Sequence, residues 1–305
     1  MSQPTISIVT PCLNRAATIG AAIESVLAQG HASFEHVVMD GGSTDGTLEV
    51  LARYPHLVVR SEPDRNLYEA YNKGLRLARG AILGLLNSDD LYAPGAFAAA
   101  EAVLADPALE MVIGAAAFFT EAAGVQRPQR RLAGVAAVGL TEANVVHNVT
   151  VMNAAFYRRG LVERVGLFDE RFPISADKDW WMRLVLAAPR QAVLDRDFYR
   201  YRSHAGSLTF GGDQRDRLSR HLLHLAALRL AECPAGSPAR AAYGRWHAWA
   251  LAYRCMLLTS GGRLGEALGA AWAGLATDPA WPCRAVTRLP AHWRGRSARR
   301  GEMQA

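Results

Sequence analysis

Short apolar runs alternate with amphipathic segments from residue 5 to residue 86. Runs rich in β-branched and apolar residues predict four buried strands, at residues 5–10, 34–39, 57–60 and 81–86. Apolar residues at helical spacing predict three helices between these strands, at residues 19–29, 47–54 and 66–79. A series of this kind forms a parallel sheet with helices on both faces. We therefore predict an α/β fold.

Beyond residue 90 the alternation becomes less regular. The remaining pattern predicts a helix, a strand, a loop, a strand, a helix and an extended segment, at residues 96–104, 111–120, 126–139, 151–157, 177–186 and 193–201. From Gln214 onward, apolar residues recur at helical spacing. We therefore expect a domain at residues 1–211, a C-terminal helical extension at 212–283 and a basic, flexible tail at 284–305.

The composition is that of a globular protein and not of a disordered one. Half of the 305 residues are hydrophobic, and 20% are charged. The formal net charge is +6, and the segment from Arg284 to Arg300 holds six arginines and no acidic residue. This segment suits either a peripheral contact with anionic lipid or a solvated, disordered tail. Nucleic acid is not an expected partner, because no basic motif interleaved with aromatic residues is present.

The positions of the cysteines and the N-terminal sequence indicate the cellular compartment in which the protein is expected. The cysteines at 12, 233, 255 and 283 are far apart and lack the C-x-x-C spacing of zinc sites. This usage does not suggest a disulfide framework, and it fits a reducing cytoplasm. The first predicted strand begins at once, so no secretory signal is expected, and no apolar stretch is long enough to span a bilayer. We therefore expect a cytoplasmic protein, soluble or peripheral at the inner face of the cell membrane.

Carboxylates follow three of the predicted parallel strands. Asp40 ends the second strand, and Asp64 lies just beyond the third. Asp89 and Asp90 follow the fourth. The carboxyl ends of parallel strands open into one crevice, so these acids can surround a single ligand. Adjacent carboxylates repel each other unless a cation lies between them, and their oxygens suit Mg²⁺ or Mn²⁺ beside a diphosphate. Each acid taken alone is also typical of a turn or a helix cap.

Two common nucleotide-binding motifs are absent from the sequence. The glycine-rich segment at 41–46 follows the second strand rather than the first, and no G-x-G-x-x-G is present. A Walker A sequence is absent as well. These observations exclude a Rossmann dinucleotide site and a P-loop.

Five segments of this region together resemble the signature series of family 2 glycosyltransferases. They occur in the order and spacing of that family, at Thr10–Asn14, Val38–Thr47, Ser61–Asp64, Tyr71–Gly74 and Leu86–Asp90. The similarity is greatest to the branch that builds bacterial exopolysaccharide and lipopolysaccharide repeat units, and it covers about residues 4–210. The resemblance implies a GT-A fold, a nucleotide-sugar donor, a divalent metal and an inverting mechanism.

The resemblance also implies a set of nucleotide-sugar contacts. The set comprises Thr10, Pro11, Asn14, Asp40, Gly41, Asp64, Asn72, Lys73, Asn87, Ser88 and Asp89. Asp40 matches the family's carboxylate that accepts a hydrogen bond from the base, usually uracil N–H, which favours a UDP-sugar. Asp64 and Asn72 match the segment that closes over the nucleoside, and Lys73 is a point charge suited to phosphate.

The metal ligands implied by the resemblance are Asp89 and Asp90. The sequence Asn87-Ser88-Asp89 stands where the family has its D-x-D motif, with an amide in place of the first acid. The ion expected there is Mn²⁺ or Mg²⁺. Asn87 contributes no charge to such a site, although it can hydrogen-bond a ribose hydroxyl.

The catalytic base is expected at the start of the helix predicted at 177–186. Inversion requires a base that deprotonates the acceptor hydroxyl. Asp177 stands where the family's acidic motif places this base. Asp179 is the alternative, although the helix dipole also favours an acid near a helix start for structural reasons. Trp180 follows, and it would either contact a sugar ring or pack in the core.

Three further side chains are expected on the acceptor and diphosphate side. His147 precedes the strand predicted at 151–157, where relatives carry a polar acceptor-side residue, and a purely structural histidine is an equal alternative. Arg202 and His204 lie in a segment that resembles the family's loop over the diphosphate. There they would neutralise the charge of the leaving group.

These features predict a metal-dependent, inverting glycosyltransferase that moves a sugar from a nucleoside-diphosphate sugar to a glycan or lipid-linked saccharide in cell-surface polysaccharide biosynthesis. Two alternatives remain: a catalytically impaired scaffold of the same fold, which Asn87 favours, and a nucleotidyltransferase. A processive polysaccharide synthase is disfavoured, because Ala242 stands where the Q-x-x-R-W motif requires Gln before Arg245-Trp246.

Overall fold

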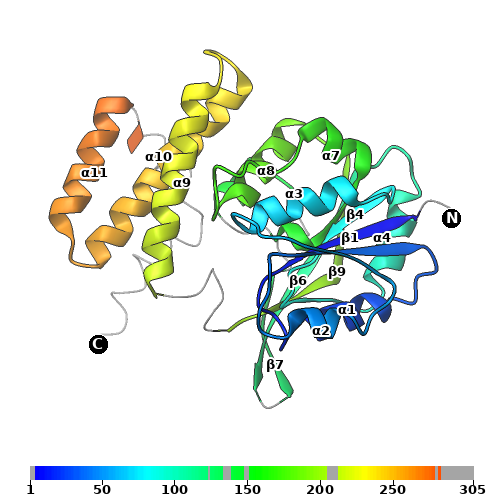
Figure 1. The fold of residues 1–305 in the computed structure, drawn as a ribbon. Coiled ribbons are helices and arrows are strands. Elements are labelled where there is room, and N and C mark those ends of the chain that lie inside the picture. The colour runs from blue at the N-terminus through cyan, green and yellow to red at the C-terminus, as the bar shows by residue number, and fades with distance from the viewer. Residues whose placement is uncertain are drawn as a thin grey trace, which may run out of the picture. The chain divides into compact units, whose positions relative to one another are not determined.

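The computed structural model describes residues 4–122, 124–132, 139–147, 151–204, 212–278 and 281–282 of the chain. The chain divides into two compact units, residues 1–210 and 211–305 (Figure 1). The division lies beside the boundary expected near Gly211 and Gly212. The basic tail expected at 284–305 lies outside the described residues.

The first unit begins with a regular alternation of strands and helices. In order these are β1 (Ile6–Cys12), α1 (Ile19–Leu27), β2 (Phe34–Asp40), α2 (Thr47–Leu51), β3 (Leu57–Ser61), α3 (Leu67–Leu77) and β4 (Ile82–Leu85). β1 pairs in parallel with both β2 and β4, and β2 pairs in parallel with β3. The predicted parallel series of strands and helices is confirmed.

The second half of this unit extends the sheet with mixed pairings. It contains β5 (Leu91–Tyr92), α4 (Ala96–Leu104), β6 (Met111–Ala122), β7 (Val125–Leu132), α6 (Glu142–Val146), β8 (Ala155–Arg158), α7 (Arg159–Val165), α8 (Ala176–Leu186) and β9 (Gln191–Arg202). The strand order is β3-β2-β1-β4-β8-β6-β9-β5, with β7 paired to β6, and β8 runs antiparallel to β4 and β6. β8 covers only part of the strand predicted at 151–157, because Met152–Ala154 forms a 3₁₀ turn.

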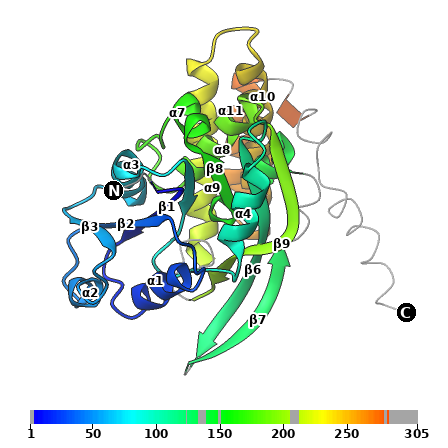
Figure 2. The ribbon, with the colours of Figure 1, turned by 90° about the vertical axis from the view of Figure 1, so that its right-hand side faces the viewer.

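The prediction of a loop at residues 126–139 is wrong for its first part. Val125–Leu132 forms β7, which pairs with β6 as a long hairpin (Figure 2). The sequence pattern does not indicate this strand, because residues 125–131 are all exposed and show no alternation of apolar and polar positions. Pro128 is tolerated, since β7 has β6 as its neighbour on one side and the register of the pair shifts beside this proline.

Alternate residues of the strands face two different layers of helices. On one face, Ile8 and Val38 belong to a core cluster with residues of α1 and α4. On the other face, Val37 and Met39 pack with Ala70 of α3. Helices therefore cover both sides of the sheet (Figures 1 and 2). Because helices cover both faces, we look for a site at the edge of the sheet where the parallel strands have their carboxyl ends and where the loops that follow them lie.

His36 of β2 makes the stability of this unit sensitive to acid. Its side chain is completely buried, and its Nε2 lies 2.9 Å from Thr10 Oγ1. Burial, together with the nearby His56, lowers the pKa of His36 from 6.5 to about 3. The folded chain stays neutral here while the unfolded chain binds a proton, so stability is lost as the pH falls through this window. The loss is about 1.4 kcal/mol per pH unit.

We therefore expect the wild-type protein to lose about 2 kcal/mol more unfolding free energy than His36→Gln between pH 6.5 and pH 5. Urea denaturation at the two pH values measures this difference. His224→Gln, which changes an exposed histidine, should follow the wild type. Equal pH dependence for the wild type and His36→Gln would contradict the prediction.

The described part of the second unit consists of three helices. They are α9 (Gly212–Glu232), α10 (Pro238–Ser260) and α11 (Leu264–Thr277), and α10 packs against both of the others. The predicted C-terminal helices are confirmed. In the part of the chain that the structure describes, no helix has the length and apolar character needed to cross a membrane.

Candidate active site

Two loops at the carboxyl edge of the sheet are tied together by hydrogen bonds. The backbone N–H of Asn14 donates to Ser43 Oγ at 2.8 Å, and the N–H of Thr44 donates to Asn14 Oδ1 at 2.9 Å. The N–H of Ala16 donates to Asp45 Oδ2 at 3.0 Å. Asn14 has a φ of 53°, a left-handed conformation that asparagine adopts more readily than most residues. The loops after β1 and β2 therefore support each other, with Asn14 as the link.

Asp40 lies at the end of β2 and is completely buried. Its Oδ2 accepts hydrogen bonds from the N–H groups of Gly42 and Ser43, at 3.1 and 3.0 Å, and from the Ser61 hydroxyl at 2.7 Å. Burial would raise the pKa of Asp40, but these bonds and one from the Ser43 hydroxyl outweigh it and lower the pKa. A base N–H can therefore reach this carboxylate only by displacing a donor. The donors that can rotate away are the Ser43 and Ser61 hydroxyls and the Cys12 thiol, whose Sγ lies 3.7 Å from Asp40 Oδ1.

Lys73 of α3 lies in a cluster of acids beside β3. Its Nζ lies 2.8 Å from Asp64 Oδ1 and from Glu62 Oε1, and 3.8 Å from Glu69 Oε1. Hydrogen bonds to Asp64 and Glu62 raise the pKa of Lys73 further above its usual value. A phosphate would compete with these acids for the ammonium group. Gly41 lies beside this cluster, since a Cβ at this position would lie 3.5 Å from Asp64 Oδ2.

Asn72, on the same helix, links α3 to the segment before α8. It is 1% exposed. Its Nδ2 donates to the Phe168 carbonyl at 2.9 Å and to Glu170 Oε1 at 2.8 Å, and its Oδ1 accepts from the Phe168 N–H at 2.9 Å. Both N–H groups and the carbonyl of this amide are therefore engaged within the protein, and a nucleoside contact would require these bonds to change.

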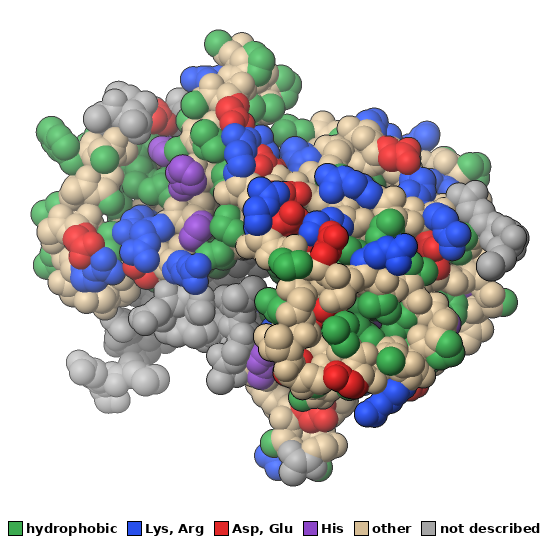
Figure 3. All heavy atoms as spheres, viewed as in Figure 1, with side chains coloured by type: hydrophobic (Ala, Val, Ile, Leu, Met, Phe, Trp, Pro, Cys, Tyr) green, Lys and Arg blue, Asp and Glu red, His purple; other side chains and the backbone are tan. Residues whose placement is uncertain are grey.

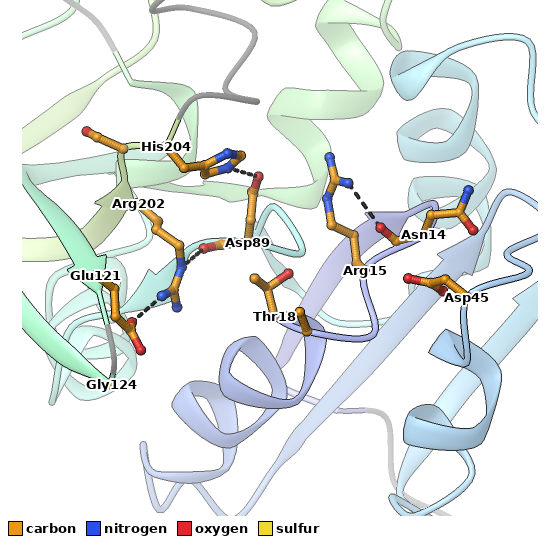
Figure 4. A pocket seen from close by; sticks show the side chains of 11 residues that line it. Asn14, Arg15, Thr18, Asp45, Asp89, Glu121, Gly124, Arg202 and His204 are labelled. Atoms are coloured by element: carbon orange, nitrogen blue, oxygen red, sulfur yellow. Dashed lines mark hydrogen bonds and ion pairs between the residues drawn. The ribbon is translucent and has the colours of Figure 1, made fainter.

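A pocket of about 420 Å³ lies where the loops after β1, β2 and β4 meet the β6–β7 hairpin and the end of β9 (Figure 4). It is lined by Asn14, Arg15, Ala17, Thr18, Asp45, Asp89, Glu121, Gly124, Arg202, Ser203 and His204. Four of these were expected from the sequence, namely Asn14, Asp89, Arg202 and His204. The fold thus brings together predicted residues from opposite ends of the first unit.

Asp89 is the acid at the end of β4 that lines this pocket, and its side chain is 20% exposed. Its Oδ2 lies 3.1 Å from His204 Nε2, and its backbone carbonyl accepts a hydrogen bond from Arg202 Nε at 2.7 Å. Arg202 also forms an ion pair with Glu121 of the hairpin (Figure 4). The residues at the end of β9 therefore lie against Asp89 and supply the pocket with a guanidinium and an imidazole.

Asp90, in contrast, is 1% exposed and is absent from the pocket lining. Its Oδ2 accepts hydrogen bonds from the Tyr199 hydroxyl at 2.8 Å and from Asn87 Nδ2 at 3.0 Å, and its Oδ1 accepts from the Arg202 N–H at 2.7 Å. Burial, and then the negative charge of Asp89, raise the pKa of Asp90 to about 7 against these bonds. Asp90 thus anchors the end of β9 to the end of β4.

Both the oxygen and the nitrogen of the Asn87 amide form hydrogen bonds in the network around Asp90. Its Oδ1 accepts a hydrogen bond from the Tyr71 hydroxyl at 2.8 Å, while its Nδ2 donates to Asp90. Asn153 Nδ2 donates in turn to the Tyr71 hydroxyl at 3.1 Å. A carboxylate at position 87 could accept from Tyr71 but could not donate to Asp90. The amide therefore suits this network, and the neighbouring Ser88 is buried beside it.

Asp177 lies in the first turn of α8, with its side chain 25% exposed. Its Oδ1 accepts a hydrogen bond from the Tyr68 hydroxyl at 2.9 Å, and its Oδ2 lies 3.9 Å from Lys178 Nζ. Asp179, the alternative base, is completely buried and pairs with Arg183 at 2.8 Å. Of these two acids, only Asp177 is open to a substrate.

Trp180 packs in the core and presents no ring to a ligand. It is 1% exposed, and its ring centroid lies 4.9 Å from that of Tyr157 and 5.0 Å from that of Phe168. Its Nε1 donates to the Gly166 carbonyl at 2.8 Å. The prediction that Trp180 contacts a sugar ring is therefore wrong, and the alternative prediction, that Trp180 packs in the core, is confirmed. His147 is half-buried at the end of α6, a helix that packs against α8.

Arg15, Thr18 and Glu121 line the pocket although the sequence does not indicate them. Arg15 and Thr18 closely follow the first glycosyltransferase-like segment, and this proximity is the signal that could have found them. Glu121 has no such signal, because its place depends on the hairpin with β7. Thr10 and Pro11, expected to contact the nucleotide, are buried in β1.

Similar solved structures define the class of this fold. A mannosyltransferase from Pyrobaculum calidifontis, solved with GDP-Man and Mn²⁺, superposes with a TM-score of 0.59 at 22% identity, covering 94% of this chain and 84% of that one. S. aureus TarS 1-349, solved with UDP, gives a TM-score of 0.58 at 20% identity, covering 80% and 70%. The fold is the GT-A fold of glycosyltransferases, as predicted.

Sequence comparison identifies the family. Residues 7–166, more than half of the chain, match the description "Glycosyl transferase family 2", and the chain belongs to this family. A PGL/p-HBAD biosynthesis glycosyltransferase of Mycobacterium bovis is 31% identical over 192 residues, which cover 60% of this chain and 70% of that protein. An uncharacterized glycosyltransferase of Mycobacterium tuberculosis is 31% identical over 190 residues, covering 61% and 70%. The protein is therefore a nucleotide-sugar glycosyltransferase.

Proposed function

We propose that this glycosyltransferase is metal-dependent and inverting, with a UDP-sugar as donor and a glycan or lipid-linked saccharide of cell-surface polysaccharide biosynthesis as acceptor. The observation that carries the proposal is the pocket in which Asn14, Asp89, Arg202 and His204 meet. It combines a carboxylate, an imidazole and a guanidinium. These are groups suited to a divalent cation and a diphosphate.

Asp89 and His204 are the residues that fit a divalent metal. Asp89 Oδ2 and His204 Nε2 lie 3.1 Å apart, so one ion could contact both, and oxygen and imidazole donors suit Mn²⁺. Mg²⁺ is the alternative ion, held chiefly by the carboxylate. Two protein ligands leave positions for diphosphate oxygens, as is usual for cations that bind substrate phosphates. When bound, the ion would neutralise charge on the departing diphosphate.

Asp177 is the residue that we assign to the acceptor. Its Oδ1 accepts a hydrogen bond from the Tyr68 hydroxyl, and its Oδ2, with Lys178 Nζ 3.9 Å away, is the oxygen that we assign to take the proton of the acceptor hydroxyl. The acceptor oxygen bonds to the anomeric carbon while the bond from that carbon to the diphosphate oxygen breaks, which inverts the configuration. Arg202 stabilises the negative charge of the leaving group, and His204 would contribute to this through the ion that it holds.

A uridine base is supported by Asp40 and by one of the similar structures. A carboxylate recognises the N3–H donor of uracil, provided that Ser43 or Ser61 releases it. S. aureus TarS was solved with UDP and with UDP-GlcNAc. The Pyrobaculum enzyme was solved with GDP-Man, so a guanine nucleotide is the competing donor to test.

Titration calorimetry with UDP tests the donor site. We expect UDP to bind the full chain about tenfold or more tightly with Mn²⁺ than with EDTA, because an ion held by Asp89 and His204 would supply positive charge to the diphosphate. Asp89→Asn should remove the metal-dependent gain. Asp106→Asn, at an exposed turn, is the matched control and should bind as the wild type. Equal affinity with and without Mn²⁺ would exclude metal-dependent donor binding, and a complete lack of nucleotide binding would overturn the proposal.

We also propose that the enzyme acts at the cytoplasmic side of the cell membrane. A lipid-linked acceptor would be presented at that surface. A protein bound peripherally there would meet such an acceptor more often than a protein free in solution.

A further inference from the structure

One helix of the second unit carries half of the exposed large apolar side chains in the described residues. These four residues, here called the α11 stripe, are Leu264, Leu268, Trp272 and Leu275, with exposed fractions of 60%, 73%, 76% and 38%. Their spacing of four, four and three residues places them along one side of the helix. Hydrophobic side chains lie on the free side of α11 in the space-filling view (Figure 3). A contiguous apolar surface of this kind is typical of an interaction site.

The opposite side of α11 is already packed against α10. Ala267 is 5% exposed, and Ala270 and Ala271 pack on a cluster that includes Leu251. A Cβ added at Gly274 would lie 2.0 Å from Leu251 Cδ2, so the two helices are in close contact there. The helix therefore has its own buried side, and the α11 stripe is not needed for that packing.

The net positive charge of the chain comes from the second unit. Residues 211–305 contain 14 arginines and six acidic residues, a formal net charge of +8, whereas residues 1–210 have a net charge of −2. Six of these arginines follow α11 in the sequence, from Arg284 to Arg300. An apolar stripe and a cluster of cations thus lie close together along the chain.

We propose that the α11 stripe binds the surface of an anionic lipid bilayer, and that the net positive charge of the second unit adds attraction to this surface. Leucine and tryptophan on one side of a helix are suited to the boundary between headgroups and acyl chains. Arginines add attraction to anionic headgroups, and two such signals give firm binding where one alone gives marginal binding. A second copy of the chain is a poorer occupant, because two units with a net charge of +8 repel each other. This surface is separate from the donor chemistry proposed above.

Vesicle co-sedimentation of the full chain tests this surface. We expect binding to vesicles containing phosphatidylglycerol to be about tenfold or more tighter than binding to phosphatidylcholine alone, and to weaken as salt is added. The double variant Leu268→Gln with Trp272→Gln should lose about tenfold or more of this affinity. The matched control changes Leu48→Gln and Leu77→Gln, two exposed leucines of the first unit, and should bind as the wild type.

Wild-type affinity in the Leu268→Gln, Trp272→Gln variant would overturn the role of the α11 stripe. Light scattering provides a second readout: a wild-type dimer that this variant abolishes would assign the stripe to a second copy and would also overturn the proposal. UDP titration of the same variant separates the two proposals. UDP binding should be unchanged there, and its failure in the wild type would refute the donor site without altering the vesicle result.

Discussion

Asp177→Asn should lower kcat by about 10² to 10⁴-fold and leave the KM for the donor nearly unchanged. The amide cannot take the proton of the acceptor hydroxyl, but its oxygen can still accept the hydrogen bond from Tyr68 that holds the side chain. The side chain is 25% exposed, so the substitution creates no buried group without a partner. Steady-state kinetics with a UDP-sugar donor separate the effects on kcat and KM.

The control for this prediction is Tyr68→Phe. It removes the hydrogen bond to Asp177 while retaining the ring that packs against Phe168, with centroids 5.3 Å apart. The loss of one such bond should cost about tenfold in kcat or less. Asp179→Asn would be a poor control, because it breaks a buried ion pair with Arg183 and would lower stability. Full turnover by Asp177→Asn would end the assignment of the base.

Asn87→Asp should destabilise the protein by about 2–4 kcal/mol at pH 8, although it restores the acid that the family motif has at this position. Asn87 Nδ2 lies 3.0 Å from Asp90 Oδ2 and donates a hydrogen bond to it. The variant loses this donor and places a second carboxylate against one that is 1% exposed. Urea denaturation of both proteins measures the difference in unfolding free energy.

The destabilisation by Asn87→Asp should shrink as the pH is lowered from 8 to 5. Facing carboxylates hold a proton between them, so the pKa of one is raised in the folded state, and stability is lost as the pH rises through that raised pKa. Asn66→Asp is the comparison variant: an acid can still cap α3 by accepting from the N–H groups of Tyr68 and Glu69, and the variant loses only a hydrogen bond of 3.3 Å from Asn66 Nδ2 to the Glu170 carbonyl at a half-buried position. Higher stability or tighter Mn²⁺ binding in Asn87→Asp would contradict the structural role of the amide.

The parts of the fold that could be predicted are those in which burial repeats along the chain. β1, β2 and β4 are buried along nearly their whole length, so they appear in the sequence as short apolar runs. The helices between the strands have one apolar side in contact with the core, which repeats every three to four residues. β7 lacks such a side because residues 125–131 are exposed. The pocket wall formed by Glu121 was therefore missed together with the strand that positions it.

The sequence by itself determined the alternating fold, the acids at the strand ends and the family, because these follow from local periodicity and short motifs. Only the tertiary structure decided which acids face the pocket: Asp89 does, while Asp90 turns inward to Tyr199, 109 positions away along the chain. The tertiary structure likewise leaves Asp177 open and buries Asp179. Neighbouring acids have the same local signals, and the direction of each side chain depends on hydrogen-bond partners that distant segments supply.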